Sequence, residues 1–326
     1  MPQMITHVAT AVAVALGLAC ASAIAADNTY PTRPVRLVVP FAPGGGSDVV
    51  GRTIGQKLTE FLGQTFVVDN RPGAASMLGT EIVAKAPADG YTLLLADIAF
   101  TVNSAYYVKQ VRFDILKDFV PIALVAETPY VLLVNPAVPA ATFKEFLALA
   151  TSQPGKVNLG SSGNGTGPHL TLELLKLRTG VNINHVPYKG GFPALSETMA
   201  GQIQATIIGM GGVLQFVESG KVRPLAVADR KRSAALPKVP TFGELGADIV
   251  VTNWYGVVGR AGTPQPVLKR LYDEIGRALT QPDVRERLKN TGLEPVAQTP
   301  GHFQRHIESE LKRWNQVIKE ARIQTE

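Results

Sequence analysis

Two glycine-rich segments carry the residue types best suited to hold a small ligand. The first reads Pro43-Gly44-Gly45-Gly46-Ser47-Asp48, and the second runs from Ser161 to Gly167 as Ser-Ser-Gly-Asn-Gly-Thr-Gly. Each follows an apolar run and precedes a helical pattern, so it would offer free backbone N–H groups and the positive end of a helix dipole. Neither segment contains Lys or Arg. This pattern favours a neutral cradle for a releasable carboxylate over a polyphosphate site.

Polar side chains add to the second segment and its surroundings. Ser161, Ser162 and Thr166 supply hydroxyl groups, and the glycines between them let the backbone approach a ligand closely. His169 could donate to the ligand, or it could cap or pack the following helix. Lys189 could pair with an anionic ligand or stay solvated. Either glycine-rich segment alone could be a tight, capped turn, but two of them favour a ligand cleft between domains.

Hydrolytic and metal chemistry are not favoured. The run from Gly160 to Asn164 fails the G-x-S-x-G nucleophile pattern at its last position, and no Asp and His follow in the order of a triad. His302 and His306 have the i, i+4 spacing of metal ligands, but no carboxylate pattern accompanies them, so two surface histidines are expected. We therefore predict no catalytic residue, no metal site and no cofactor.

Dinucleotide binding is the remaining enzymatic alternative. A strand, the glycines 44–46, a helix and a strand that ends in Asp69 follow one another, and an acid at that distance is what ribose binding requires. Two features weaken this alternative: Val49 stands at the third glycine position, and Pro43 stiffens the turn.

The elements around these segments alternate between strand and helix. Apolar, β-branched runs predict strands at 35–40, 66–69 and 91–96, with helices at 50–62 and 77–86 between them. A second set predicts strands at 131–134, 157–160, 183–186, 203–208 and 225–228, with helices at 142–151, 168–179, 193–200 and 213–219. Helices at 264–280, 282–290 and 300–320 close the chain. The fold class is therefore α/β, with mainly parallel sheets flanked by helices.

The last three helices have no strand of their own to cover, so we expect them to pack on the first sheet. Lobe 1 would then be discontinuous, with residues 26–128 and 251–326, and lobe 2 would be residues 129–250. The chain would cross between the lobes twice, near 127–129 and near 250–252, which is the physical basis of a hinge.

The N-terminal residues 1–25 resemble a secretory signal peptide. Residues 1–26 contain no Asp, Glu, Lys or Arg, and Ala23-Ile24-Ala25 is a small-x-small cleavage pattern. The alternative is a membrane anchor, but the apolar run of roughly a dozen residues is shorter than the ~20 that a spanning helix needs. The only cysteine, Cys20, lies in this segment. We predict export to the periplasm.

Composition excludes other classes. The 326 residues are 45% hydrophobic and 18% charged, which argues against disorder, and 32 Lys and Arg against 26 Asp and Glu give a net charge of +6. The excess is spread out rather than clustered, so no nucleic-acid partner is expected.

An ordered series of motifs resembles the receptors of tripartite tricarboxylate transporters, also called Bug-type solute receptors. The motifs are the segment 30–48, Val-Asp-Asn-Arg-Pro-Gly-Ala at 68–74, Ala-Asp-Gly-Tyr-Thr-Leu-Leu at 88–94, the segment 160–170, Val-Pro-Tyr-Lys-Gly at 186–190, Asn-Trp-Tyr-Gly at 253–256 and Ala-Gly-Thr-Pro at 261–264. The resemblance spans essentially the whole chain after residue 29.

This resemblance implies a two-lobed, type II-like periplasmic binding protein, not an enzyme, that closes on a small carboxylate and delivers it to membrane permease subunits. A monomer is expected. An exported sensor that feeds a membrane kinase is the alternative role. The expected ligand-binding residues are Phe41, Pro43, Gly44, Gly45, Gly46, Ser47, Asp48, Asp97, Ser161, Ser162, Gly163, Gly165, Thr166, His169, Tyr188, Lys189 and Gly190. A β-branched residue at position 45 is expected to abolish binding without unfolding the protein.

Four departures from the family pattern concern the far end of the ligand. Gln204 replaces a common Asp, and the segment Gly209-Met210-Gly211-Gly212 is unusually small. Asn-Ser-Ala-Tyr-Tyr at 103–107 replaces a common Asn-Pro-x-Leu-Tyr, and Asp97 stands where small or hydroxyl residues are common. If the Asp97 carboxylate faces the cleft, it would favour a ligand with an amine. The alternative is a helix N-cap turned away from the cleft.

Overall fold

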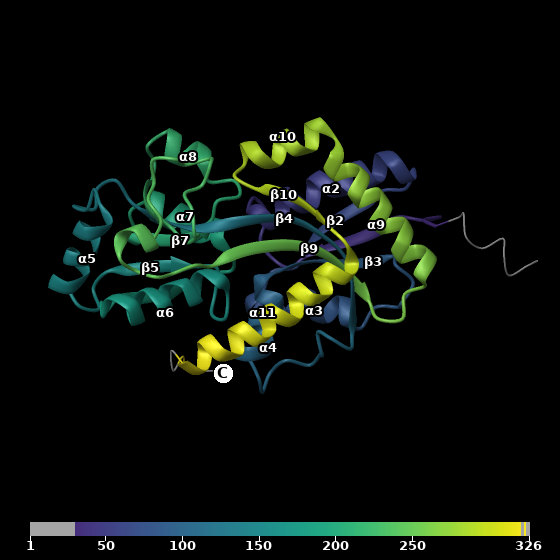
Figure 1. Cartoon of the computed structure of the whole chain (residues 1–326), viewed down its shortest axis with the longest axis horizontal. Helices are drawn as coiled ribbons and strands as arrows, with labels where there is room; N and C mark the ends of the chain where they lie inside the picture. Colours follow the sequence, from purple (N-terminus) through teal and green to yellow (C-terminus); the bar gives the residue numbers. More distant parts are fainter. Residues whose placement is uncertain (1–29, 321–322, 324–326) are drawn as a thin grey trace, which may run out of the picture.

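The computed structural model describes residues 30–320 and 323 and consists of two lobes (Figure 1). The strand predicted at 35–40 forms β1 (Val35–Val39), and its apolar side chains are almost fully buried. It pairs in parallel with β2 (Phe66–Asn70) and with β3 (Thr92–Asp97). These strands belong to the sheet of the first lobe.

Three further strands extend the first sheet through antiparallel pairing. β9 (Thr252–Arg260) lies between β3 and β4 (Phe119–Val134), and β10 (Glu294–Gln298) pairs with β4. β4 is 16 residues long and continues into the second lobe. Figure 1 shows β4 and β9 running through the middle of the molecule.

The second sheet is built on the far half of β4. Residues 130–134 of β4 pair antiparallel with β7 (Ala205–Gly209), and residues 131–134 pair with β8 (Arg223–Val227). β5 (Asn158–Ser161) pairs in parallel with both β7 and β6 (Asn184–Pro187). Two lobes, each with a sheet flanked by helices and joined by the shared strand β4, confirm the predicted fold class.

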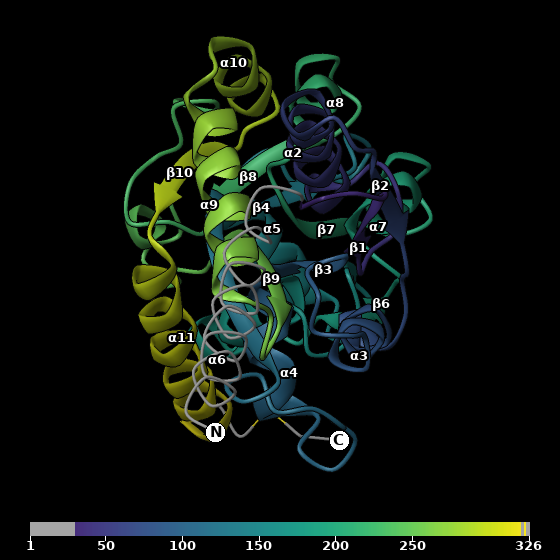
Figure 2. The same ribbon diagram turned by 90° about the vertical axis from the view of Figure 1, so that its right-hand side faces the viewer.

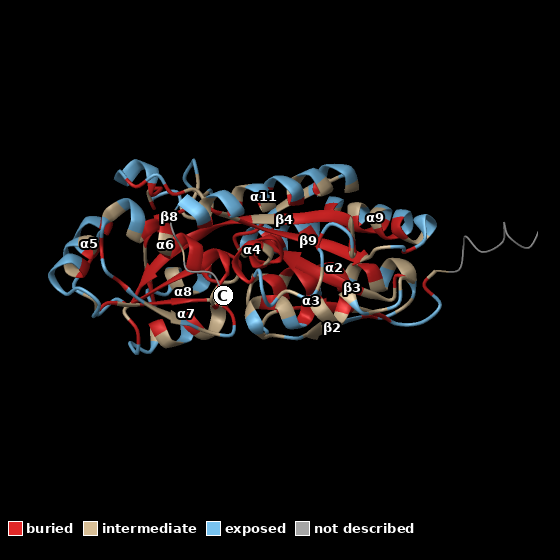
Figure 3. Cartoon of the chain, turned by 90° about the horizontal axis from the view of Figure 1, so that it is seen from below, coloured by how far each residue is buried: buried red, intermediate tan, exposed pale blue. Residues whose placement is uncertain are grey.

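Helices cover both faces of each sheet. They are α2 (Gly46–Leu62), α3 (Met77–Ala84), α4 (Ile98–Tyr106), α5 (Phe143–Ser152), α6 (Gly167–Thr179), α7 (Gly191–Met199), α8 (Leu214–Glu218), α9 (Gln265–Thr280), α10 (Pro282–Asn290) and α11 (Pro300–Glu320), with short 3-10 turns η2 (Ala74–Ser76) and η3 (Gly243–Leu245). α9 packs on β4 and α2, and α11 packs on α4 and β4. Figure 2 shows α9, α10 and α11 along one side, and Figure 3 shows the buried strands between helices with exposed outer faces.

The structure contains elements that the sequence pattern did not reveal. β4 begins at Phe119, whereas only 131–134 was predicted, because Pro121 and Pro129 within it are residues that usually mark strand ends. The pairing with β9 shifts register just after Pro121, so the strand tolerates the missing donor. β9, β10 and α4 were also not predicted. Both sheets are therefore mixed, with parallel strands on one side only.

Local capping fixes several helix ends. Thr142 and Glu145 form a capping box at the start of α5, and Gly63 ends α2 in the left-handed conformation.

Within residues 30–320, no helix combines the length and apolarity needed to span a membrane. The predicted signal peptide lies outside the described residues.

Candidate functional site

Both glycine-rich segments lie at the seam where the two lobes meet, the first against the second lobe and the second against the end of α4 in the first lobe. α2 begins at Gly46 beyond the end of β1, and α6 begins at Gly167 beyond β5. Gly211, which follows β7 in the second sheet, lies so close to Gly46 that an added Cβ would be 2.9 Å from the Gly46 Cα. A Cβ on Gly190 would likewise lie 3.6 Å from Ala42. A Cβ on Gly165 would lie 2.7 Å from the Tyr107 ring, and the Tyr107 hydroxyl donates to the Asn164 carbonyl at 3.1 Å. The first segment thus approaches Gly211 and Gly190 of the second lobe, whereas the second segment approaches the end of α4.

The first segment is shaped by a buried carboxylate. Asp48 accepts hydrogen bonds from the Gly44 backbone N–H at 3.1 Å, from Arg52 Nε at 2.9 Å and from Asn70 Nδ2 at 3.1 Å. Burial alone would raise the pKa of Asp48, but these hydrogen bonds outweigh it and hold the pKa below its ordinary value. Gly44 itself has a φ of +91°, which favours glycine. Asp48 therefore stabilises the turn, and its negative charge is already paired with Arg52.

The second segment is shaped by its own hydroxyl groups. The Ser161 Oγ is buried, accepts the Gly163 N–H at 3.1 Å and lies 2.6 Å from His185 Nε2. The Thr166 hydroxyl donates to the Gly163 carbonyl at 2.7 Å. These side chains are engaged within the loop, so the groups left to face the cleft come mainly from its backbone and from Ser162.

A stacked histidine pair supports this loop from behind. The rings of His169 and His185 lie 4.4 Å apart and nearly parallel, and the Gly165 N–H donates to His169 Nδ1 at 3.1 Å. His169 Nδ1 must be unprotonated to accept this bond. Burial lowers the pKa of His169 to about 4 and that of His185 to about 3. Both rings are therefore neutral at ordinary pH. His185 had no role in the sequence-based interpretation.

A cavity of about 60 Å³ lies between the lobes at one end of the seam. Its lining combines four expected residues with a segment that was not predicted as part of the site. The lining residues are Pro40, Phe41, Gly73, Ala74, Ala75, Ser76, Ser162, Tyr188 and Lys189. Lys189 is the one charged residue among them, is exposed, and has no ion pair within the described part of the chain. The cavity thus offers a cation, hydroxyl groups and backbone.

The unexpected lining segment has an unusual backbone. Ala74, Ala75 and Ser76 all have positive φ values of 46°, 51° and 79°, which non-glycine residues rarely adopt. Asn103 Nδ2 donates to the Ala75 carbonyl at 2.6 Å and to Ser76 Oγ at 3.1 Å, so α4 holds this turn in place. Strained backbone of this kind gathers at ligand sites. Alanine gives no sequence signal for it, and only the motif at 68–74 pointed to this stretch.

Asp97 is the N-cap of α4. Its Oδ1 accepts the Ala99 N–H at 3.0 Å, so the capping alternative describes the observed geometry. The side chain is only 6% exposed, and burial raises its pKa to about 7, partly opposed by the hydrogen bond from Ala99. Asp97 pairs in register with Tyr255 of β9.

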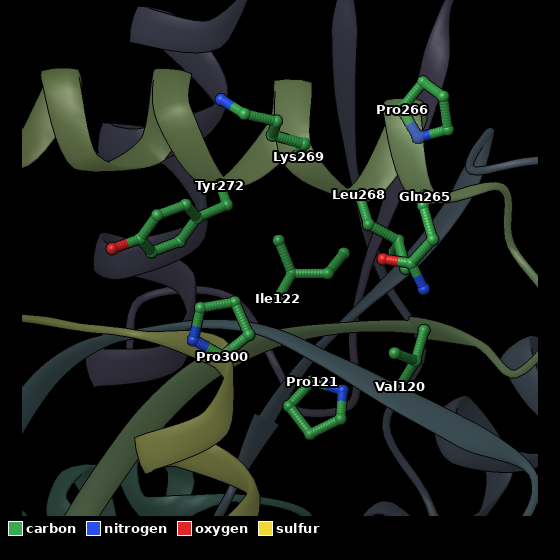
Figure 4. Close-up of a pocket in the computed structure, with 9 residues that line it drawn as sticks. All are labelled: Val120, Pro121, Ile122, Gln265, Pro266, Leu268, Lys269, Tyr272 and Pro300. Atoms are coloured by element: carbon green, nitrogen blue, oxygen red, sulfur yellow. The ribbon is translucent and has the colours of Figure 1, made fainter.

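A larger recess of about 550 Å³ lies elsewhere, between β4, the first turns of α9 and the start of α11 (Figure 4). Its lining is mostly apolar and includes none of the expected site residues. His302 and His306 are also outside the seam, and the described residues contain no group of three potential metal ligands.

Comparison with known proteins points to one family. The model of the family described as "Tripartite tricarboxylate transporter family receptor" matches residues 50–323. Protein BugT of Bordetella pertussis is 35% identical over 318 residues, which are 97% of this chain and 98% of BugT.

Solved structures agree in fold. An R. palustris protein with adipate is 35% identical, has a TM-score of 0.87 and is matched over 90% of this chain and 98% of its own. MatC from Rhodopseudomonas palustris with bound malate is 31% identical, with a TM-score of 0.85 over 89% of this chain and 100% of its own.

Proposed function

Because the chain belongs to the tripartite tricarboxylate transporter receptor family, we propose that it is an exported receptor that captures a small carboxylate between its two lobes. The observation that carries this proposal is the cavity between the lobes, which is lined by Phe41, Ser162, Tyr188 and Lys189 from the loops that precede α2, α6 and α7. Helix starts and free backbone N–H groups suit a carboxylate. Two similar receptors were solved with adipate and with malate, which are both carboxylates. The family consists of receptors, not enzymes.

The residues divide into two roles in this proposal. The backbone of 41–47 and of 162–165, together with the backbone and side chains of 188–190, contacts the ligand. Asp48, Ser161, Thr166 and His169 hold these loops in shape through the hydrogen bonds described above.

Domain closure is the proposed mechanism. A ligand that contacts both lobes binds the closed state better than the open state, and this difference in affinity drives closure. The lobes would be residues 26–128 with 251–326 and residues 129–250, with the hinge where β4 passes from one sheet to the other. Residues 1–25 would direct export to the periplasm.

Delivery to membrane permease subunits is the proposed destination of the ligand, with the receptor acting as a monomer. A sensor role, in which the closed form is presented to a membrane kinase, is the alternative. The two roles predict different neighbouring genes, permease or kinase, and different effects of deletion: loss of ligand uptake, or loss of a transcriptional response with uptake intact.

Mass spectrometry of the molecule released from denatured, purified protein tests the proposal. We expect a small carboxylate, which should then raise the melting temperature of ligand-free protein. Lys189→Gln should weaken binding of that ligand, whereas the matched change Lys156→Gln, at an exposed lysine outside the cavity, should not. Failure to release a carboxylate, together with no thermal shift from a panel of organic acids and amino acids, would overturn the proposal.

A further inference from the structure

A buried acid and two tyrosines lie at the floor of the seam. Asp97 ends β3, and its register partner Tyr255 projects from the same face of the sheet. The Tyr255 hydroxyl lies against Gly46, where an added Cβ would collide with it, and 3.6 Å from a Cβ placed on Gly209 of β7. Asp97 and Tyr255 thus lie where α2 begins and where the second lobe approaches.

Tyr130 brings the second helix start to the same place. It is the first residue of β4 to pair with β7, and its ring lies against Gly167, the first residue of α6. Tyr130 and Tyr255 are each 3% exposed. A Cβ on Gly209 would lie 3.6 Å from the Tyr255 hydroxyl and 3.8 Å from the Tyr130 ring, so the two side chains lie close together. Burial, and next to it the charge of Asp97, raises the pKa of both phenols. Within residues 30–320, the Tyr130 hydroxyl has no hydrogen-bond partner.

The Asp97 carboxylate has unused binding capacity. Its Oδ1 accepts the Ala99 N–H, and within the described part of the chain no Lys or Arg pairs with it and no donor reaches Oδ2. A neutral Ser, Thr or Asn caps a helix as well as Asp does. A buried charge without a cation is costly, so capping alone does not account for an acid at this position.

We propose that Asp97, with the hydroxyls of Tyr130 and Tyr255 beside it, is the subsite for an ammonium group, so that the ligand is an amino acid rather than a simple organic acid. This inference rests on the proposed receptor function. The ligand carboxylate is held by the helix starts and loops, and the ammonium group supplies the cation that Asp97 lacks. A second carboxylate at the same place would be repelled.

Binding would also move a proton. The fraction of Asp97 that is protonated in the ligand-free protein must ionise when the ammonium group arrives, and that proton goes to the buffer. The number of protons released per ligand is obtained by measuring the binding enthalpy in buffers of different ionisation enthalpy.

The test uses pairs of probes that differ in one group. L-Aspartate and L-malate share a carbon skeleton and both carboxylates, and differ only in an ammonium group against a hydroxyl at C2; the other amino acids and their 2-hydroxy counterparts form further pairs. Isothermal titration in phosphate and in Tris at pH 7 should show at least one amino acid that binds at least tenfold more tightly than its hydroxy counterpart, with proton release.

Asp97→Asn is the decisive variant, because asparagine retains the helix cap. It should remove the preference for the amino acid and the proton release, while binding of the hydroxy acid is kept or improved. Asp248→Asn, at an exposed aspartate away from the seam, is the matched control and should change neither. Melting temperatures near the wild type would show that both variants are folded.

Three results would overturn the inference: no amino acid that binds more tightly to the wild type than its hydroxy counterpart, an amino-acid preference that survives in Asp97→Asn, or binding of organic acids only. The last result leaves the receptor function standing. If no amino acid or organic acid binds at all, the receptor function fails as well.

Discussion

The contact between Gly211 and Gly46 offers a direct test of closure, because one residue comes from each lobe. A methyl group on Gly211 would lie 2.9 Å from the Gly46 Cα and 3.2 Å from Leu293 Cδ2. Carbon atoms in favourable contact are about 3.5–4.0 Å apart. In Gly211→Ala the two lobes would therefore have to separate by up to about 1 Å at this contact.

The size of the effect follows from the state in which the clash occurs. Overpacking of one methyl group costs about 1–3 kcal/mol. Gly211 does not have a positive φ, so alanine strains no backbone there, and the open state avoids the contact altogether. The cost therefore falls on the ligand-bound closed state, and Kd should rise by a factor of about 5 to 150. The melting temperature of the ligand-free protein should stay near the wild-type value.

Calorimetric Kd values and small-angle scattering of the ligand-bound protein measure this effect. Gly276→Ala is the matched control, because a Cβ there meets nothing within 4 Å and the residue lies in α9, outside both glycine-rich segments. A Cβ at Gly45 meets no protein atom within 4 Å, so the expected loss of binding with a β-branched residue there concerns the ligand alone and stays a prediction. Wild-type affinity in Gly211→Ala, or an equal loss in Gly276→Ala, would refute the closure argument.

Three further predictions concern stability. Because burial lowers the pKa of His169 from 6.5 to about 4 and of His185 to about 3, the unfolded chain takes up protons below pH 6.5 that the folded protein does not. As the pH falls from 6 to 4, the free energy of unfolding should therefore decrease by up to about 1.4 kcal/mol per pH unit for each histidine. The double variant His169→Gln/His185→Gln should lack this contribution, and thermal melts over the same pH range measure the difference. Thr142→Ala should cost about 1 kcal/mol in urea unfolding through loss of the α5 cap, and an unchanged midpoint would contradict the capping box. Gly256→Ala should lower the free energy of unfolding by about 1–3 kcal/mol, because its methyl group would overlap the Phe303 ring. An unchanged melting temperature would contradict this prediction, because it would mean that α11 shifts at little energetic cost.

The local βα units could be predicted because their signals are local. The strand at 35–40, the glycines after it and the helical spacing from Val50 to Leu62 lie within 30 residues, and β1 and α2 form there. α9, α10 and α11 begin within a residue of their predicted starts, since proline marks each first turn. β4 was largely missed, because its prolines argue against a strand and its partners β9 and β7 are remote in sequence.

The candidate site likewise contains residues that local sequence signals predict and residues that only the tertiary structure reveals. Ser162, Tyr188 and Lys189 follow from loops between a strand and a helix, and the structure places them on the cavity. The turn at 74–76 was not foreseen, because alanine does not signal a positive φ and the hydrogen bonds from Asn103 that hold it come from another element.

The sequence by itself therefore determined the family, the glycine-rich helix starts and the neutral character of the loops, since these depend on residue type and short spacing. Tertiary structure alone decided which groups remain available to a ligand. Asp48 and Ser161 are engaged by remote partners, Asn70 and His185, whereas Asp97 accepts only the local Ala99 N–H within the described part of the chain. The physical reason is that burial and pairing of a polar group depend on neighbours that the fold brings from distant parts of the chain.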